Sequence, residues 1–301
     1  MRETIHINPD FPEDFSSIND IYEALEITKP RFSGFARLKS MDVYVKSSSP
    51  ISLKRRLKKA PRSTGPWRSA PRIREYRNLL KLRERGFPAA RPLIAAEKRV
   101  FGFLERQLLV TERVSNSASL FDLAVQGKLE QNQLLAINWR LGCLVGRMHN
   151  AGFCHRDLFM RNIVVGLNDA EPSLHFIDCH QGSWSRFPGR AFAYDLGCYE
   201  KWAATLFDGK TRAHFFAGYF KERPGEDLKK LLRLTNQARQ RLVLRRQKRK
   251  REIHKKRQLL DPKFKSEPLD PTLICRLLSS KSSEALHHVA GCSDKQRSLI
   301  T

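Results

Sequence analysis

A run of polar side chains at residues 155–162 has the types and spacing that suit proton transfer and metal binding. It reads His-Arg-Asp-Leu-Phe-Met-Arg-Asn, so Asn162 follows Asp157 by five residues, and an apolar stretch comes next. A carboxylate can accept or orient the proton of an attacking hydroxyl, and an amide oxygen nearby can hold a metal ion. We therefore expect Asp157 to be a catalytic base and Asn162 to be a metal ligand.

A second acidic side chain, Asp178, stands in a matching place. It follows the apolar residues 174–177 and lies sixteen residues after Asn162. A single Asp behind a strand is usually a turn former, but a hard cation such as Mg²⁺ needs several oxygen donors together. This order is typical of the catalytic and metal-binding segments of protein kinases. It predicts Asp178 as a second Mg²⁺ ligand and ATP as the phosphate donor.

Charged residues upstream complete the kinase pattern. Lys46 ends the β-branched segment 41–46, which is expected to be a strand, and Glu75 opens the helical segment that follows. In kinases the strand lysine pairs with nucleotide phosphates and a helix glutamate holds it in place. Glu112 lies, by position, in the hinge where backbone groups meet adenine. We expect these three residues to bind the nucleotide.

Three residues are assigned supporting roles. His155 and Arg156 precede the predicted base and are expected to support the loop or the acceptor. Asp195 lies in the helical segment 191–220, where a kinase aspartate braces the catalytic loop from the following helix. Its expected role is structural.

The order of elements predicts an α+β, two-lobed protein-kinase-like fold with a small C-terminal lobe. Apolar periodicity predicts helices from Ile73 to Gly86 and over 133–150, and short strands at 162–166 and 174–178, whereas 29–40 is expected to be a loop after a short amphipathic segment. The predicted division is a β-rich N-terminal lobe, a helical lobe, and a basic, helical and partly disordered tail, over residues 1–111, 112–228 and 229–301.

Charge is the plainest feature of the composition. The chain has 56 Lys and Arg against 31 Asp and Glu, a formal net charge of +25. Residues 229–257 hold fourteen basic side chains and one acid, and residues 54–74 hold nine and none. Such a field attracts polyanions: nucleic acid, an anionic membrane surface or a phosphorylated glycolipid. No run of about 18 apolar residues and no signal pattern occurs, so a cytoplasmic location is expected.

With these residues in view, the chain resembles the lipopolysaccharide core kinases, the Kdo/WaaP family related to the InaA proteins. Residues 74–92 are similar to that family's helix followed by a Gly-Ile-Pro run. Residues 155–159 resemble its His-Arg-Asp followed by an aromatic, and residues 177–182 resemble its Ile-Asp-x-His segment. The resemblance covers roughly residues 40 to 205. Two features depart from kinase patterns: Gly34 alone precedes the lysine strand, and Gln181 replaces a common Arg.

The resemblance implies phosphoryl transfer from ATP, with Mg²⁺, to a sugar hydroxyl of the lipopolysaccharide inner core, a heptose or Kdo. It implies a protein peripheral to the cytoplasmic face of the inner membrane that acts on an anionic glycolipid. Asp157 would be the base, Asn162 and Asp178 the metal ligands, Lys46 the phosphate-binding group and Glu75 its partner.

Other readings remain open at this stage. An atypical protein kinase or small-molecule kinase would keep every catalytic residue and change only the acceptor. A polyanion- or nucleic-acid-binding protein with a degenerate kinase domain would explain the basic segment 229–257, which is also interpretable as a membrane-surface anchor or a solvated helix face. That segment contains no Phe, Tyr or Trp for stacking on bases, which disfavours nucleic acid. A pseudokinase scaffold is disfavoured because all four catalytic groups are present.

Overall fold

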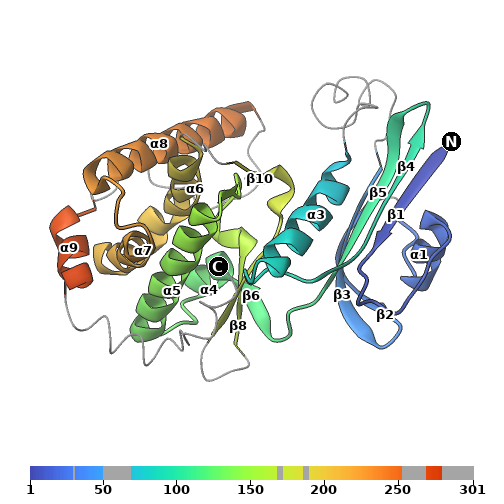
Figure 1. The fold of residues 1–301 in the computed structure, drawn as a ribbon, viewed down its shortest axis with the longest axis horizontal. Helices are drawn as coiled ribbons and strands as arrows, with labels where there is room; N and C mark the ends of the chain where they lie inside the picture. Colours follow the sequence, from blue (N-terminus) through green and yellow to red (C-terminus); the bar gives the residue numbers. More distant parts are fainter. Residues whose placement is uncertain (30, 50–68, 168–171, 186–189, 253–268, 280–301) are drawn as a thin grey trace. The chain divides into compact units, whose positions relative to one another are not determined.

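The computed structural model describes residues 1–29, 31–49, 69–167, 172–185, 190–252 and 269–279 (Figure 1). The chain divides into two compact units. The first is Met1–Ser115 together with Ile177–Gln181, and the second is Asn116–Phe176 together with Gly182–Thr301. The short segment that carries Asp178 therefore belongs to the N-terminal unit, although the chain on both sides of it belongs to the other.

The first unit is built on a five-stranded antiparallel sheet with the order β1-β4-β5-β3-β2. The strands are β1 (Arg2–Ile7), β2 (Phe32–Leu38), β3 (Met41–Ser48), β4 (Pro92–Val100) and β5 (Phe103–Glu112). Lys46 lies on β3 opposite Leu109 of the central strand β5. Its backbone is therefore fixed by ladder hydrogen bonds in the middle of the sheet.

Alternating side chains of the sheet build the core of this unit. Val43 and Val45 are fully buried and pack with Ile94 and Val110 of the neighbouring strands and with helix α1 (Ile18–Ala24). Side chains alternate between the two faces of a strand, so Tyr44 and Lys46 lie on the face opposite the two valines. The period that buries the valines thus also sets the direction of the lysine.

Helix α3 (Pro71–Glu84) confirms the helix predicted from Ile73. Proline stands at its first turn, where a missing N–H costs nothing, and Gly86 follows its end with φ +74°. One face of α3 is buried, and the helix contacts β4, β5 and the 3₁₀ turn η3 (Cys179–Gln181). This contact brings Glu75 and the Asp178 segment into one unit.

Two strands of this sheet were not predicted. Residues 29–40 were expected to be a loop, but Phe32–Leu38 forms β2, which pairs with β3 in register Gly34 to Val45. A local pattern of Phe, Gly, Ala and Leu is weak because β2 is an edge strand with one half-buried face. Strand β1 is also an edge strand, and its pairing with β4 joins residues far apart in the sequence.

The second unit is mostly helical. Its helices are α4 (Leu120–Gln126), α5 (Gln131–Asn150), α6 (Ala191–Leu206), α7 (Gly209–Glu222), α8 (Leu228–Glu252) and α9 (Pro271–Ser279). A small sheet of β6 (Ser117–Ser119), β8 (Ile163–Gly166) and β9 (Ser173–Phe176) and a pair of β7 (Phe153–Cys154) and β10 (Ser183–Trp184) flank the 3₁₀ turn η2 (Met160–Asn162). The helix predicted at 133–150 and the strands predicted at 162–166 and 174–178 are confirmed to within a few residues.

Helices α5 and α7 lie side by side at very close range (Figure 1). A Cβ at Gly142 of α5 would lie 2.0 Å from the carbonyl oxygen of Phe215, and a Cβ at Gly218 of α7 would lie 2.2 Å from that of Trp139. Glycine at both positions lets backbone touch backbone, so the pair packs without an intervening layer of side chains. Gly146 extends the same contact towards the end of α5.

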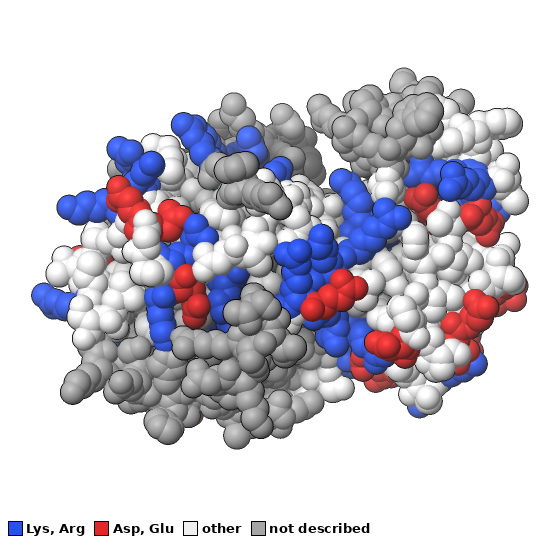
Figure 2. All heavy atoms as spheres, viewed as in Figure 1, with Lys and Arg blue, Asp and Glu red and all other residues white. Residues whose placement is uncertain are grey.

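Helix α8 packs along α6 within the second unit. Leu231, Leu242 and Val243 of α8 are buried, and Gly197 of α6 allows Ala238 to approach closely. This agrees with the interpretation of the basic segment as a helix that packs through its leucines and exposes a solvated face. Lys and Arg side chains occupy the part of the surface that α8 forms (Figure 2). Among the described residues, no helix has the length and apolar composition needed to cross a membrane.

The close contact of α5 and α7 makes a stability prediction. Gly142→Ala is expected to lower the free energy of unfolding by about 1–3 kcal/mol, because the new methyl group collides with backbone that cannot move aside cheaply. Gly209→Ala at the start of α7 is the matched control, since nothing lies within 4 Å of its Cβ position. Thermal and denaturant unfolding of the two variants measure the difference, and equal stabilities would contradict the close packing.

Candidate active site

The N-terminal unit places Lys46 in a small ionic network. Its Nζ lies 2.6 Å from Oε1 of Glu75 and 3.4 Å from Oδ1 of Asp178. Glu75 is almost completely buried, and its second oxygen accepts a hydrogen bond from Arg72 at 2.6 Å. Burial alone would lower the pKa of Lys46, but the carboxylates of Glu75 and Asp178 raise it above its ordinary value. The ammonium group is therefore charged at neutral pH.

Asp178 has an unusual backbone conformation and a cationic surrounding. Its φ is +58°, in the left-handed region that Asp tolerates better than most residues. Its Oδ1 lies 3.2 Å from Nδ1 of His180 and 3.9 Å from Nη1 of Arg72, besides the contact with Lys46. Burial works to raise the pKa of this carboxyl, but the hydrogen bond from His180 and the charges of Lys46 and Arg72 hold it well below its usual range.

The turn that carries Asp178 is fastened to α3. Nδ2 of Asn78 donates a hydrogen bond of 2.8 Å to the carbonyl oxygen of Cys179. The Cys179 thiol is fully buried and contacts the carbonyl oxygen of Glu75 at 3.9 Å, and burial raises its pKa well above the ordinary value. Asp178 and Glu75 are thus held near each other by neighbouring backbone and by the cations Lys46 and Arg72, each of which contacts both carboxylates.

The donor atoms of this network suit a divalent cation. Potential ligand atoms of Glu75, Asp178 and His180 lie within 4.8 Å of one another. Lys46, His180 and Arg72 all contact Oδ1 of Asp178. Its other oxygen, Oδ2, has no partner within the described part of the chain. A carboxylate oxygen that is ionised and unshared is what Mg²⁺ requires.

In the second unit, Asp195 holds the backbone of the candidate catalytic loop. This fully buried carboxylate accepts hydrogen bonds from the amides of His155, at 2.7 Å, and Arg156, at 2.6 Å. Nε2 of His149 lies 3.3 Å from the same carboxylate, and burial lowers the pKa of that imidazole. Arg156 has φ +59°, a conformation that the two anchored amides stabilise.

Asp157 and Asn162 are joined within this loop. Nδ2 of Asn162 donates hydrogen bonds to the backbone oxygen of Asp157, at 2.7 Å, and to its Oδ2, at 2.9 Å. These two bonds use both N–H donors of the amide. The amide oxygen Oδ1 of Asn162 has no hydrogen-bond partner in the described ranges. An amide oxygen that is fixed and unshared is a suitable metal ligand. Arg161 lies 3.2 Å from Oδ2 of Asp157 and limits the directions in which that carboxylate can point.

Cations and aromatic rings surround this loop. The guanidinium of Arg161 lies 4.4 Å from the ring centre of Phe159, and Nζ of Lys201 lies 4.9 Å from the same ring. Lys201 also lies 5.8 Å from the ring of Trp202, over which Arg246 of α8 is placed at 4.9 Å. Burial, together with the charges of Arg246 and Arg161, lowers the pKa of Lys201 to about 8.

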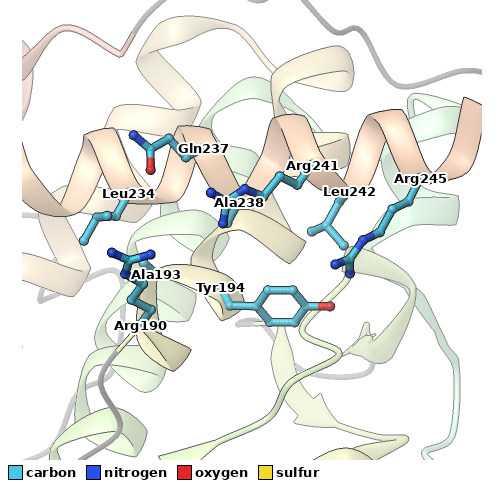
Figure 3. Close-up of a pocket in the computed structure, with 9 residues that line it drawn as sticks. All are labelled: Arg190, Ala193, Tyr194, Leu234, Gln237, Ala238, Arg241, Leu242 and Arg245. Atoms are coloured by element: carbon cyan, nitrogen blue, oxygen red, sulfur yellow. The ribbon is translucent and has the colours of Figure 1, made fainter.

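A cavity of about 120 Å³ opens between α6 and α8. Figure 3 shows Arg190 reaching from the start of α6 towards α8, and Arg245 reaching from α8 towards the ring of Tyr194. Arg241 and Gln237 complete its polar lining, which contains no carboxylate. Burial raises the pKa of Tyr194 to about 12, and the charge of Asp157 contributes to this shift. The cavity therefore lies within electrostatic reach of the catalytic loop.

The remaining predicted residues are less informative. Glu112 ends β5 and lies 3.5 Å from Arg91, and its role beside adenine stays a prediction. His155 is buried among aromatic rings, whereas Arg156 is exposed. Much of the basic stretch 54–74 lies outside the described residues.

The sequence missed three groups near these sites. Arg72 precedes Glu75 by one helical turn, a spacing that could have identified it. His180 was noted as part of a motif and given no role. Nothing in the local sequence marked Lys201.

Comparison with known proteins places these motifs in a family. A family model described as the lipopolysaccharide kinase (Kdo/WaaP) family matches residues 42–219. A 3-deoxy-D-manno-octulosonic acid kinase of Pasteurella multocida is 34% identical over 106 residues, which are 35% of this chain and 42% of that protein. The enzyme of the same name from Actinobacillus succinogenes is 37% identical over 93 residues, 30% of this chain and 36% of that protein. The chain thus spans less than half the length of these curated relatives.

A solved structure supports the fold. WaaP, determined in a complex with acyl carrier protein, superposes with a TM-score of 0.53 over 78% of this chain and 91% of WaaP, at 19% sequence identity. At this identity the likeness concerns the fold, which is therefore protein-kinase-like, as the order of elements predicted.

The anchoring of the catalytic loop leads to a second prediction. Asp195→Asn is expected to lower the free energy of unfolding by about 1–3 kcal/mol, because the amide nitrogen cannot accept one of the two buried backbone N–H groups. Asp208→Asn makes the same chemical change at the exposed N-cap of α7, where Asn serves as well as Asp. Denaturant unfolding compares the two, and a stability of Asp195→Asn equal to that of Asp208→Asn would refute the anchoring role.

Proposed function

This chain belongs to the lipopolysaccharide kinase (Kdo/WaaP) family, and on that basis we propose that it is an ATP-dependent kinase. Its acceptor in this proposal is a sugar hydroxyl of the lipopolysaccharide inner core, on a heptose or Kdo. The observation that carries the proposal is the network in which Glu75 and Asp178 hold the charged Lys46 on a central region of the sheet. A lysine oriented in this way has its charge ready for nucleotide phosphates.

The donor side of the proposed reaction uses groups of the N-terminal unit. Lys46 binds phosphate oxygens of ATP, and Glu75 keeps it extended. Arg72 neutralises the second oxygen of Glu75, so the buried carboxylate has both of its oxygens satisfied. Backbone groups near Glu112 bind the adenine in this scheme.

Mg²⁺ is proposed as the metal. Asp178 and Asn162 each offer an oxygen without another partner in the described ranges, and both are held in place by hydrogen bonds from or to neighbouring groups. The ion would supply neutralisation of phosphate charge, as it does in kinases generally. The protein would keep the Asp178 carboxylate ionised and the Asn162 amide oxygen correctly oriented.

The acceptor side uses the loop of the second unit. Asp157 accepts or orients the proton of the attacking sugar hydroxyl, while Asn162 fixes the direction of its carboxylate. Asp195 acts through the backbone and is a positioning residue. Because the proposed acceptor is lipid-linked, we place the protein at the cytoplasmic face of the inner membrane, where exposed cations such as Lys229 and Lys230 attract anionic lipid.

The role of Asp157 is tested by substitution. Asp157→Asn is expected to reduce the turnover number by about 10²–10⁴-fold, since the amide cannot take the proton, while the fold and ATP binding persist. Asp122→Asn removes an exposed carboxylate at the start of α4 and serves as the control. Transfer of labelled phosphate from ATP to deacylated core oligosaccharide is the measurement, and a turnover number near that of the unmodified protein would exclude Asp157 as base.

The metal requirement gives a further prediction. Asp178→Asn is expected to raise the Mg²⁺ concentration needed for half-maximal transfer by about tenfold or more, because a charged oxygen ligand becomes neutral. The turnover number at saturating Mg²⁺ separates a binding defect from misfolding. An unchanged Mg²⁺ dependence would count against Asp178 as a ligand.

Analysis of the product decides between acceptor classes. Phosphate found on a core sugar by mass spectrometry supports the proposal. Phosphate found only on Ser or Thr of added proteins points instead to an atypical protein kinase. Transfer to neither, with gel shifts that disappear as salt rises, points to a polyanion-binding protein.

A further inference from the structure

Lys201 is a buried lysine that forms no ion pair with any residue that the structure describes. Its side chain lies in α6 and the residue is only 7% exposed. In the part of the chain that the structure describes, it makes neither a hydrogen bond nor an ion pair. The Nζ atom of Lys201 is nevertheless not fully enclosed, so solvent or a ligand can reach it. Buried lysines are normally paired, because an unpaired charge is costly to remove from water.

The surroundings of Lys201 add positive charge instead of compensating it. Arg161 shares the ring of Phe159 with it, and Arg246 shares the ring of Trp202. Three cations therefore lie over two neighbouring rings. The carboxylate of Asp157 acts on the charge of Lys201, but it is already paired with Arg161. The low pKa of Lys201 is the electrostatic sign of this missing negative charge.

The same two helices continue this positive surface. The cavity between α6 and α8 is lined by Arg190, Arg241 and Arg245, and none of these has an ion pair with another described residue (Figure 3). Natural surfaces mix both signs of charge unless the field serves to bind or steer a ligand. The seam of α6 and α8 thus favours a ligand that is negatively charged.

We propose that Lys201 and Arg246 form a binding site for an anionic group, a phosphate or a carboxylate, on the sugar acceptor. The inference rests on the proposed function and names the feature of the substrate that the site recognises. The acceptor is favoured over the nucleotide for two reasons. Lys201 neighbours the loop of Asp157, the predicted base, and the N-terminal unit already supplies Lys46 and Arg72 for nucleotide phosphates.

The aromatic rings explain why this site can be ready before the ligand arrives. Phe159 and Trp202 hold Lys201 in place by cation–π contact, which leaves the N–H donors of its ammonium group available. The ammonium of Lys201 can then bind a phosphate or carboxylate as a compact charge, and the guanidinium of Arg246 over the same Trp202 ring adds a second positive charge beside it.

The test compares kinetic constants for the acceptor and for ATP. In Lys201→Met, KM for deacylated core oligosaccharide is expected to rise about 10- to 100-fold, the loss of one charge-assisted contact. KM for ATP and the turnover number should change by less than about threefold. Methionine preserves the length and the contacts with both rings. Lys201→Arg keeps the charge and should recover most of the acceptor binding.

Matched controls separate this site from general electrostatics. Arg246→Gln should raise the acceptor KM, whereas Arg233→Gln should not, because Arg233 is exposed on the same helix about 20 Å away along its axis. Both variants lose the same charge. Thermal unfolding shows whether either substitution disturbs the packing of α8.

Modified acceptors identify the anionic group. If the site binds a phosphate, dephosphorylated oligosaccharide will bind the unmodified protein weakly and Lys201→Met will reduce its affinity no further. If it binds a carboxylate, carboxyl-reduced oligosaccharide will behave in that way instead. A rise in KM for ATP with none for the acceptor would overturn the inference.

Calorimetric binding of the oligosaccharide without ATP separates this inference from the proposed function. Binding that depends on Lys201, in a protein that transfers no phosphate, would refute the kinase and leave the anion site standing. Transfer to the core sugar with equal acceptor affinity in Lys201→Met would do the reverse.

Discussion

The buried carboxylate of Asp195 is the constraint on which the catalytic loop depends. A fully buried charge is stable only when several donors satisfy it, and here two backbone amides and an imidazole do so. Satisfying it forces Arg156 into a left-handed conformation and so sets the exit direction of the chain at Asp157. The burial of Asp195 in the helical unit therefore fixes the direction of the Asp157 side chain.

The N-terminal unit solves a comparable problem with side chains. Glu75 lies on the buried face of α3. Lys46 donates to one of its carboxylate oxygens and Arg72 donates to the other. Because the Asp178 turn is bonded to α3 through Asn78, the same helix positions both carboxylates that face the lysine. The position of α3 on the sheet therefore brings together the charges that raise the pKa of Lys46 and lower the pKa of Asp178.

Much of this arrangement could be read from the sequence, and the exceptions share a physical cause. Lys46, Glu75, Asp157 and Asn162 could be proposed as functional residues because each stands at a fixed place in a local sequence motif. Strand β2 was missed because the formation of an edge strand depends on a partner that is distant in the sequence. Lys201 was missed for the same reason: its significance lies in what surrounds it, and Arg246 is 45 positions further along the chain.

The sealed thiol of Cys179 has a consequence for studying motion in this protein. Only a deprotonated and accessible thiol reacts with alkylating reagents, and Cys179 is neither while its turn rests against α3. The rate at which Cys179 is alkylated therefore measures how often the segment next to Asp178 detaches briefly from α3. The exposed Cys275 supplies an internal standard for the same reagent, so the protein carries both a reporter and its calibration in its native sequence.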